Sequence, residues 1–212
     1  SGTMQRYLSD RPATSVRHKS MEMFRENLEK TSNGRIKVEI FGAGALGNEA
    51  ELTDMVKMGT VQGTRGGAFA KANKKFLIYT LPFLFSDTDS VLKAMRSEFG
   101  ASIGKHAEQN GYYIPATGVA GGFRQISNNK KAINLPEDVA GLKIRTPPIE
   151  TIVKTMQALG ANPQSIPYGE TYMALKMGVV DGQENPPSNI AEMKFYEAQK
   201  FLSVVDYQIH PD

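Results

Sequence analysis

The order of the predicted elements along the 212-residue chain indicates an α/β protein. Strand-like and helix-like segments alternate over most of its length. Residues 51–63 match residues 170–182 without gaps, with six identities in thirteen positions, and each segment combines a helix, a glycine and the entry to a strand. We interpret the match as one αβ unit used in two similar lobes, with a ligand crevice between them. The alternative is chance recurrence of a common connection.

Composition excludes several functions. The 25 basic and 22 acidic side chains leave a net charge of +3, too small for general nucleic-acid binding. Cysteine is absent, which excludes disulfides, thiolate metal sites and a cysteine nucleophile. The three histidines share no metal-ligand spacing, and no apolar run is long enough to span a bilayer. We therefore expect no metal and no membrane span.

In the first half of the chain, the spacing of apolar residues predicts a helix over residues 16–32. Its core-facing residues are expected to be Val16, Met21, Phe24 and Leu28. Strict alternation over 35–40 predicts a strand with one buried face, and a helix over 49–58 is expected to end at Gly59. The remaining expected elements are a buried strand end and turn over 77–85, helices over 89–96 and 98–110, and strands over 112–119 and 123–126.

In the second half, residues 134–138 signal a helix start, and residues 142–145 form a strand that ends before Pro147 and Pro148. Helices are expected over 150–159, 170–177 and 190–199. A fainter echo links residues 34–38 to 141–145, each interpreted as the strand upstream of the repeated helix.

Arg145 is the first candidate for a binding residue. A guanidinium between a strand and two prolines is positioned to take a carboxylate with two parallel hydrogen bonds; the alternative is an ordinary surface ion pair. Arg124 follows two glycines, which either allow a ligand close to the backbone or form a turn. Arg65 lies among small residues after a strand, and it either meets an anion or points to water.

Residues 181–187 combine carboxylates, amides and prolines. Asp181 and Glu184 are candidates for the acid/base pair of an enzyme acting on a carbohydrate or organic acid, although no sequence neighbour would hold either carboxylate protonated. Asn185 donates and accepts hydrogen bonds at once, so it is the better candidate for a ligand contact. The glycine-rich residues 42–47 satisfy the bare dinucleotide-binding pattern, but no acidic residue stands where that fold requires one.

Several stretches together resemble the substrate-binding proteins of tripartite ATP-independent periplasmic (TRAP) transporters, the DctP-like family. They are residues 34–41, 46–49, 81–85, 122–124, 136–145, 159–163, 180–186 and 194–197, in the family's order. The resemblance implies a two-lobed fold like that of type II periplasmic binding proteins, each lobe a mixed sheet flanked by helices. It also implies a periplasmic receptor that closes on an organic acid by hinge motion, without catalysis or cofactor, and delivers it to a membrane permease.

The same resemblance implies the ligand contacts. They are Arg145, which binds the substrate carboxylate, Arg124, Asn185, the aromatic Tyr168, and Asn48 and Glu49 from a first-lobe loop. Gln62 stands where the family usually has Asp, and Arg65 stands in a segment that is usually small or apolar. A second cation near the cleft suits a second acidic group, so we expect a dicarboxylate or an acidic sugar.

The expected organisation is a first lobe over residues 1–123, a second over 124–204, and the start of a return crossing over 205–212. Family members continue beyond this point, so the resemblance implies a chain shortened at its C-terminus. Its first lobe would then expose apolar surface that favours self-association. At the other end, residues 1–4 are interpreted as residues added before a mature chain, with no signal peptide.

Overall fold

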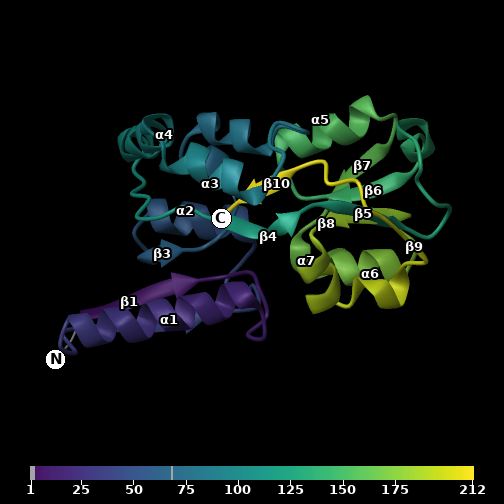
Figure 1. Cartoon of the computed structure of the whole chain (residues 1–212). Coiled ribbons are helices and arrows are strands. Elements are labelled where there is room, and N and C mark those ends of the chain that lie inside the picture. Colours follow the sequence, from purple (N-terminus) through teal and green to yellow (C-terminus); the bar gives the residue numbers. More distant parts are fainter. Residues whose placement is uncertain (1–2, 68) are drawn as a thin grey trace.

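Two α/β lobes make up the computed structural model, which describes residues 3–67 and 69–212 (Figure 1). The first lobe contains β1 (Thr3–Leu8), α1 (Val16–Thr31), β2 (Ile36–Phe41), α2 (Glu49–Lys57), β3 (Gly63–Thr64), the 3-10 helices η1 (Phe69–Lys71) and η2 (Lys74–Thr80), α3 (Thr88–Arg96), α4 (Glu98–Gln109) and β4 (Val119–Phe123). The second contains β5 (Gln125–Asn128), η3 (Pro136–Val139), β6 (Lys143–Thr146), α5 (Glu150–Ala158), β7 (Asn162–Ser165), η4 (Tyr168–Glu170), α6 (Thr171–Lys176), β8 (Gly182–Asn185), α7 (Pro187–Glu192), η5 (Phe195–Ala198) and β9 (Phe201–Ser203). A last strand, β10 (Ile209–Pro211), returns to pair with β4, so the described chain passes between the lobes twice.

The two lobes share one topology. The series β1–α1–β2–α2–β3 gives the parallel strand order β2-β1-β3, and β6–α5–β7–α6–β8 gives the parallel order β7-β6-β8. The second sheet then adds β5, which is antiparallel to β8, and β9, which is antiparallel to β5. Gly63 pairs with Tyr7 of β1, and Gly182 pairs with Ile144 of β6, so the two glycines occupy equivalent places. The match between residues 51–63 and 170–182 is therefore a structural repeat, as predicted.

The end of the repeated helix is built the same way in both lobes. Gly59 and Gly178 have φ of 75° and 70°, and their N–H groups donate to the carbonyls of Val56 and Leu175 at 3.0 and 3.1 Å. Only glycine adopts this left-handed conformation at low cost. The fainter echo, by contrast, is wrong as an equivalence: β2 lies at the sheet edge and corresponds to β7, whereas β6 is central and corresponds to β1.

Each lobe has its own core. Leu8, Leu52 and Val61 pack together in the first lobe, and Ile144 and Met156 centre the core of the second. The helix expected over 16–32 is present, but its buried face is narrower than predicted. Met21 is buried, whereas Val16 is 75% exposed and Phe24 is 41% exposed, because α1 packs mainly along the edge strand β2.

Three expected elements differ in the structure. Residues 77–85 contain the expected turn, in which Phe83 has φ of 57°, but the expected strand end is wrong, because residues 77–80 are the end of η2. Residues 112–118 form no strand, because pairing with β10 begins only near Val119. The helix expected over 190–199 is broken where Lys194 adopts a left-handed conformation, and it divides into α7 and η5.

The sequence analysis missed β1, β7, β9 and β10, which are short or lack clear alternation. Residues 1–2 lie outside the described residues, but Thr3 and Met4 pair with Ile36 and Lys37 and begin the central strand of the first lobe. The pairing shows that Thr3 and Met4 are part of the fold, and the interpretation of residues 1–4 as residues added before a mature chain stays a prediction. Among the described residues, no helix is long and apolar enough to cross a membrane.

Gly182→Ala is expected to lower the free energy of unfolding by about 1 to 3 kcal/mol. A Cβ at Gly182 would lie 2.1 Å from the backbone carbonyl oxygen of Ser127, which β5 holds in place. The equivalent Gly63→Ala is the matched control, since the atoms nearest to its Cβ belong to the side-chain ring of Tyr7, which can shift. Urea denaturation of the three proteins checks the order, and equal losses in both variants would contradict it.

Candidate functional site

A cavity of about 360 Å³ lies between the lobes. It sits beyond the carboxyl ends of β1 and β6, where the two repeated units face each other, and open α/β sheets bind ligands at such ends. The first lobe contributes Asp10, Arg11, Arg17, Asn48, Glu49 and Gly67, with His210 from β10; the second contributes Arg124, Arg145, Tyr168, Asn185 and Asn189. Six of the seven predicted ligand-binding residues therefore line one cavity.

Arg145 lies in β6 and is only 2% exposed. Its Nε donates to the carbonyl of Ile166 at 2.8 Å, which orients the guanidinium. Burial, with the nearby charges of Arg124 and Arg11, lowers the pKa of Arg145 to about 10, although Glu184 acts in the opposite direction. Among the described residues no carboxylate forms an ion pair with it. A buried cation without a counter-ion is a site for an anion.

Arg124 is held differently. Its Nε pairs with Oε2 of Glu184, and its Nη2 donates to Oε1 and to the carbonyl of the same residue, both at 2.8 Å. The hydroxyl of Tyr207 also donates to Oε2 of Glu184, at 2.5 Å. Burial disfavours the charge of Arg124, but Glu184 outweighs that effect and raises its pKa above the usual value. Arg124 therefore lines the cavity with its charge already neutralised.

The other predicted residues surround this pair. Asn185, at the end of β8, donates to Oε1 of Gln183 at 2.7 Å and accepts from Arg124 at 3.3 Å. The ring of Tyr168 lies 3.4 Å from the guanidinium carbon of Arg11, a stack that joins the two lobes. Asn48 caps α2 by accepting from the N–H groups of Ala50 and Glu51.

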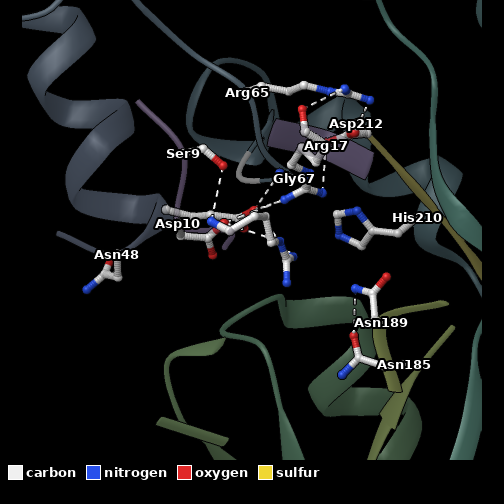
Figure 2. Close-up of polar contacts among 12 residues, drawn as sticks. Ser9, Asp10, Arg17, Asn48, Arg65, Gly67, Asn185, Asn189, His210 and Asp212 are labelled. Atoms are coloured by element: carbon white, nitrogen blue, oxygen red, sulfur yellow. Dashed lines mark hydrogen bonds and ion pairs between the residues drawn. The ribbon is translucent and has the colours of Figure 1, made fainter. Parts of the chain in front are cut away.

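The first lobe presents a network that the sequence analysis missed. Glu49 pairs with Arg17 at 2.8 Å, Asp10 contacts Arg11 at 3.2 Å, and Arg17 reaches Asp212 at 2.7 Å (Figure 2). Burial and Glu49 raise the pKa of Asp10 to about 6, whereas Arg17 and Arg11 lower the pKa of Glu49 to about 2 although its burial alone would raise it. Recognising β1 in the sequence would have pointed to Asp10 and Arg11, because both lie within three residues of the carboxyl end of that strand.

Arg65 is the one predicted residue outside the cavity lining. Its Nη2 pairs with Oδ2 of Asp212 at 2.6 Å, and its Nη1 donates to the carbonyl of Arg17 at 3.4 Å. Figure 2 shows Arg65 at the top of the view, on the side of the network away from Asn185 and Asn189. The structure gives no support to Arg65 as a second free cation for a ligand.

The enzyme alternative lacks a site. Neither Asp181 nor Glu184 lines the cavity. Asp181 accepts from the N–H of Lys143 at 2.9 Å, and Glu184 is fully buried with both carboxylate oxygens taken. The carboxylate of Asp181 is thus engaged with β6, and that of Glu184 with Arg124 and Tyr207, rather than arranged around a substrate. The sequence reasoning placed them after a strand, but β8 includes residues 182–185.

The glycine-rich loop of residues 42–47 connects β2 to α2, yet it does not form a dinucleotide site. Asn48 and Glu51 already satisfy the first N–H groups of α2 in a reciprocal cap. Glu49, in the first turn, adds a negative charge where a phosphate would bind. Among the described residues, no group of three or more metal-ligating side chains gathers.

His210→Gln is expected to remove about 2 kcal/mol of acid destabilisation between pH 7 and 4.5. Burial, with the charge of Arg124, lowers the pKa of His210 to about 4, so the folded state keeps it neutral and loses stability as the pH falls below 6.5, the ordinary value. Asp10, whose pKa is raised to about 6, acts with the opposite sign, so Asp10→Asn should steepen the loss. Denaturation at a series of pH values measures the free energy of unfolding of both variants, with His106→Gln at an exposed site as the control. A pH dependence identical to that of the wild-type protein would contradict the roles given to His210 and Asp10.

An architecture in which two α/β lobes share one ligand cavity is that of the bilobal solute-binding proteins. The chain belongs to one family of this class, the bacterial extracellular solute-binding proteins of family 7 (DctP), whose description fits residues 9–211. The resemblance identified from the sequence is confirmed, as are the α/β class and the two-lobed fold. The family is one of transport proteins.

Solved structures and relatives agree with this assignment. A TRAP periplasmic solute-binding protein from Polaromonas sp. JS666, bound to D-erythronate, is 30% identical with a TM-score of 0.93, over 99% of this chain and 69% of that one. One from Sulfurospirillum deleyianum DSM 6946, with bound succinate, is 29% identical with a TM-score of 0.91, over 100% and 69%. The C4-dicarboxylate-binding periplasmic protein DctP of Rhodobacter capsulatus is 34% identical over 89% of this chain and 57% of that protein. The chain spans 34% to 63% of the length of the first curated relatives it matches.

Proposed function

We propose that the chain is the ligand-binding part of a periplasmic receptor that captures a small organic acid. The observation that carries the proposal is the buried guanidinium of Arg145, which lines a cavity between two lobes and has no carboxylate partner among the described residues. The related proteins named above bind erythronate, succinate or C4-dicarboxylates, and each of these carries a carboxylate. A bidentate pair between that carboxylate and Arg145 is the central contact.

Hinge closure is the proposed mechanism. Residues 1–123 with 205–212 move against residues 124–204, and the hinge consists of the two crossings, between β4 and β5 and between β9 and β10. Asn48 and Glu49 approach the ligand from the first lobe, while Arg145, Tyr168 and Asn185 hold it from the second. Closure is favoured because the ligand contacts both lobes only in the closed state. Arg65 does not contact the ligand in this mechanism; it stabilises the first-lobe side of the cavity through its ion pair with Asp212.

The receptor returns its ligand unchanged and delivers it to the membrane permease of a TRAP transporter. An enzyme would instead consume the ligand, so product analysis after long incubation separates the two. Self-association of the chain stays a prediction that sedimentation at several concentrations tests.

Isothermal titration of the chain against a panel of mono- and dicarboxylates, with neutral polyols as controls, tests the function. We expect at least one acid to bind and its matched neutral polyol not to bind, because only the carboxylate neutralises Arg145. Bound ligand should also raise the melting temperature. Binding of neutral polyols alone would overturn carboxylate recognition, and so would the absence of binding by any acid.

A further inference from the structure

The charges of the first-lobe network balance among themselves. Its members are Arg11, Arg17 and Arg65, which pair with Asp10, Glu49 and Asp212. Three guanidinium groups face three carboxylates, so the network as a whole carries no formal charge. None of its cations is left over to neutralise a ligand.

The remaining basic side chains that line the cavity either pair with a carboxylate or are neutral, with one exception. Arg124 is neutralised by Glu184, and Lys71 pairs with Asp54 at 2.5 Å. His210 is neutral near pH 7, since its pKa is lowered to about 4 by burial. Arg145 is thus the single cation of the described lining that has no carboxylate partner.

This balance limits the charge of the ligand. One carboxylate against Arg145 brings the cavity to neutrality. A second carboxylate would lose its hydration without gaining an uncompensated cation, and burying such a charge is costly. It would also face Asp10 and Glu49, two carboxylates of the same lining.

The lining offers instead buried polar atoms that make no hydrogen bond within the described residues. Oδ1 of Asp10, Nη1 of Arg11, the hydroxyl of Tyr168 and Nε2 of His210 are buried without a hydrogen bond among the described residues. Asp10 lies on one side of the cavity, His210 at its flank, and Asn185 and Asn189 on the opposite side (Figure 2). A hydroxyl group both donates and accepts, so it can serve an orphaned donor and an orphaned acceptor together.

We propose that the ligand is a small monocarboxylate that carries several hydroxyl groups, a sugar acid in chemical class, and not a dicarboxylate. The proposal rests on the proposed function, in which Arg145 binds the carboxylate. Overall similarity does not choose between the two classes, because the neighbours with erythronate and succinate are 30% and 29% identical. The charge balance of this chain's own cavity favours the hydroxy monocarboxylate over the dicarboxylate.

A set of four-carbon compounds tests the ligand class with no change to the protein. Titration should show D-erythronate binding at least about tenfold tighter than butyrate, which lacks the hydroxyls, and than succinate, which adds a charge. Erythritol, which has the hydroxyls but no carboxylate, should not bind. D-Galactonate extends the series to a longer hydroxy acid, and either hydroxy acid in first place supports the proposal.

Asp10→Asn adds a test by gain of binding. The substitution removes one carboxylate and leaves three guanidinium groups against two carboxylates, so the network gains one excess positive charge. Succinate should therefore bind at least about tenfold tighter than it binds the wild-type chain. Glu39→Gln is the matched control, because it makes the same charge change at an exposed pair with Arg6 outside the cavity. Melting curves show whether each variant is folded.

The outcomes separate the two proposals. If succinate is the tightest ligand of the wild-type chain, the sugar-acid proposal fails and carboxylate binding stands. If butyrate equals the hydroxy acids, the unpartnered polar atoms do not contact ligand, and the proposal fails in the same way. If no acid binds, or erythritol binds as well as erythronate, the proposed function itself fails, and the ligand class fails with it.

Discussion

Replacing Arg145 with alanine is expected to weaken binding of the organic acid by about 2 to 5 kcal/mol, a loss of roughly 30-fold to several thousand-fold in affinity. The ligand carboxylate would be buried without the one cation that has no carboxylate partner in the described part of the lining. Arg145→Lys should also weaken binding, because an ammonium keeps the charge but loses both the planar fork and the Nε contact to the carbonyl of Ile166.

Arg145→Ala should weaken ligand binding without lowering the stability of the ligand-free protein. The guanidinium of Arg145 is buried near two like charges, Arg124 and Arg11, so its removal in the ligand-free protein relieves repulsion and desolvation. We expect the melting temperature without ligand to be unchanged or higher, while the shift caused by ligand disappears. Arg96→Ala, at an exposed site in the last turn of α3, is the control for loss of an arginine. Unchanged affinity in either Arg145 variant would contradict the assignment.

Glu184→Gln is expected to have the largest effect on stability, about 3 to 5 kcal/mol. The substitution leaves the guanidinium of Arg124, which is 5% exposed, buried without its counter-charge, and it places an amide beside two donors, Arg124 and the hydroxyl of Tyr207. Urea denaturation measures the loss. Glu150→Gln, which breaks an exposed pair with Lys154, should cost no more than about 0.5 kcal/mol.

A double variant shows whether the loss in Glu184→Gln comes from the unpaired charge of Arg124 or from the absence of the ion pair itself. Arg124→Met combined with Glu184→Leu removes both charges, and it should be more stable than Glu184→Gln because no charge is left uncompensated. If Glu184→Gln is as stable as the wild-type protein, the buried pair between Arg124 and Glu184 does not stabilise the fold. If the double variant is the least stable, packing rather than charge dominates there.

Local signals in the sequence predicted most helices and the repeat. The glycines that end α2 and α6 are readable because only glycine takes that conformation cheaply, and the match around them proved to be a topological equivalence between lobes. Strands were harder, since pairing with a distant partner decides them. Residues 112–118 have strand-like composition but form no strand, and pairing of their backbone with the last strand begins only at Gly118. The strand β1, by contrast, was not predicted, and it is the centre of a sheet.

The sequence by itself determined the α/β class, the repeated unit, the family, and Arg145 as a strand-end arginine, because each depends on residues close together along the chain. Only the tertiary structure decided which cations are available to a ligand. Arg124 meets Glu184 sixty positions away, and Arg65 meets Asp212 across most of the chain. Charge compensation depends on distance in space, so the sequence offered three arginines for the site and the fold leaves one of them unpaired.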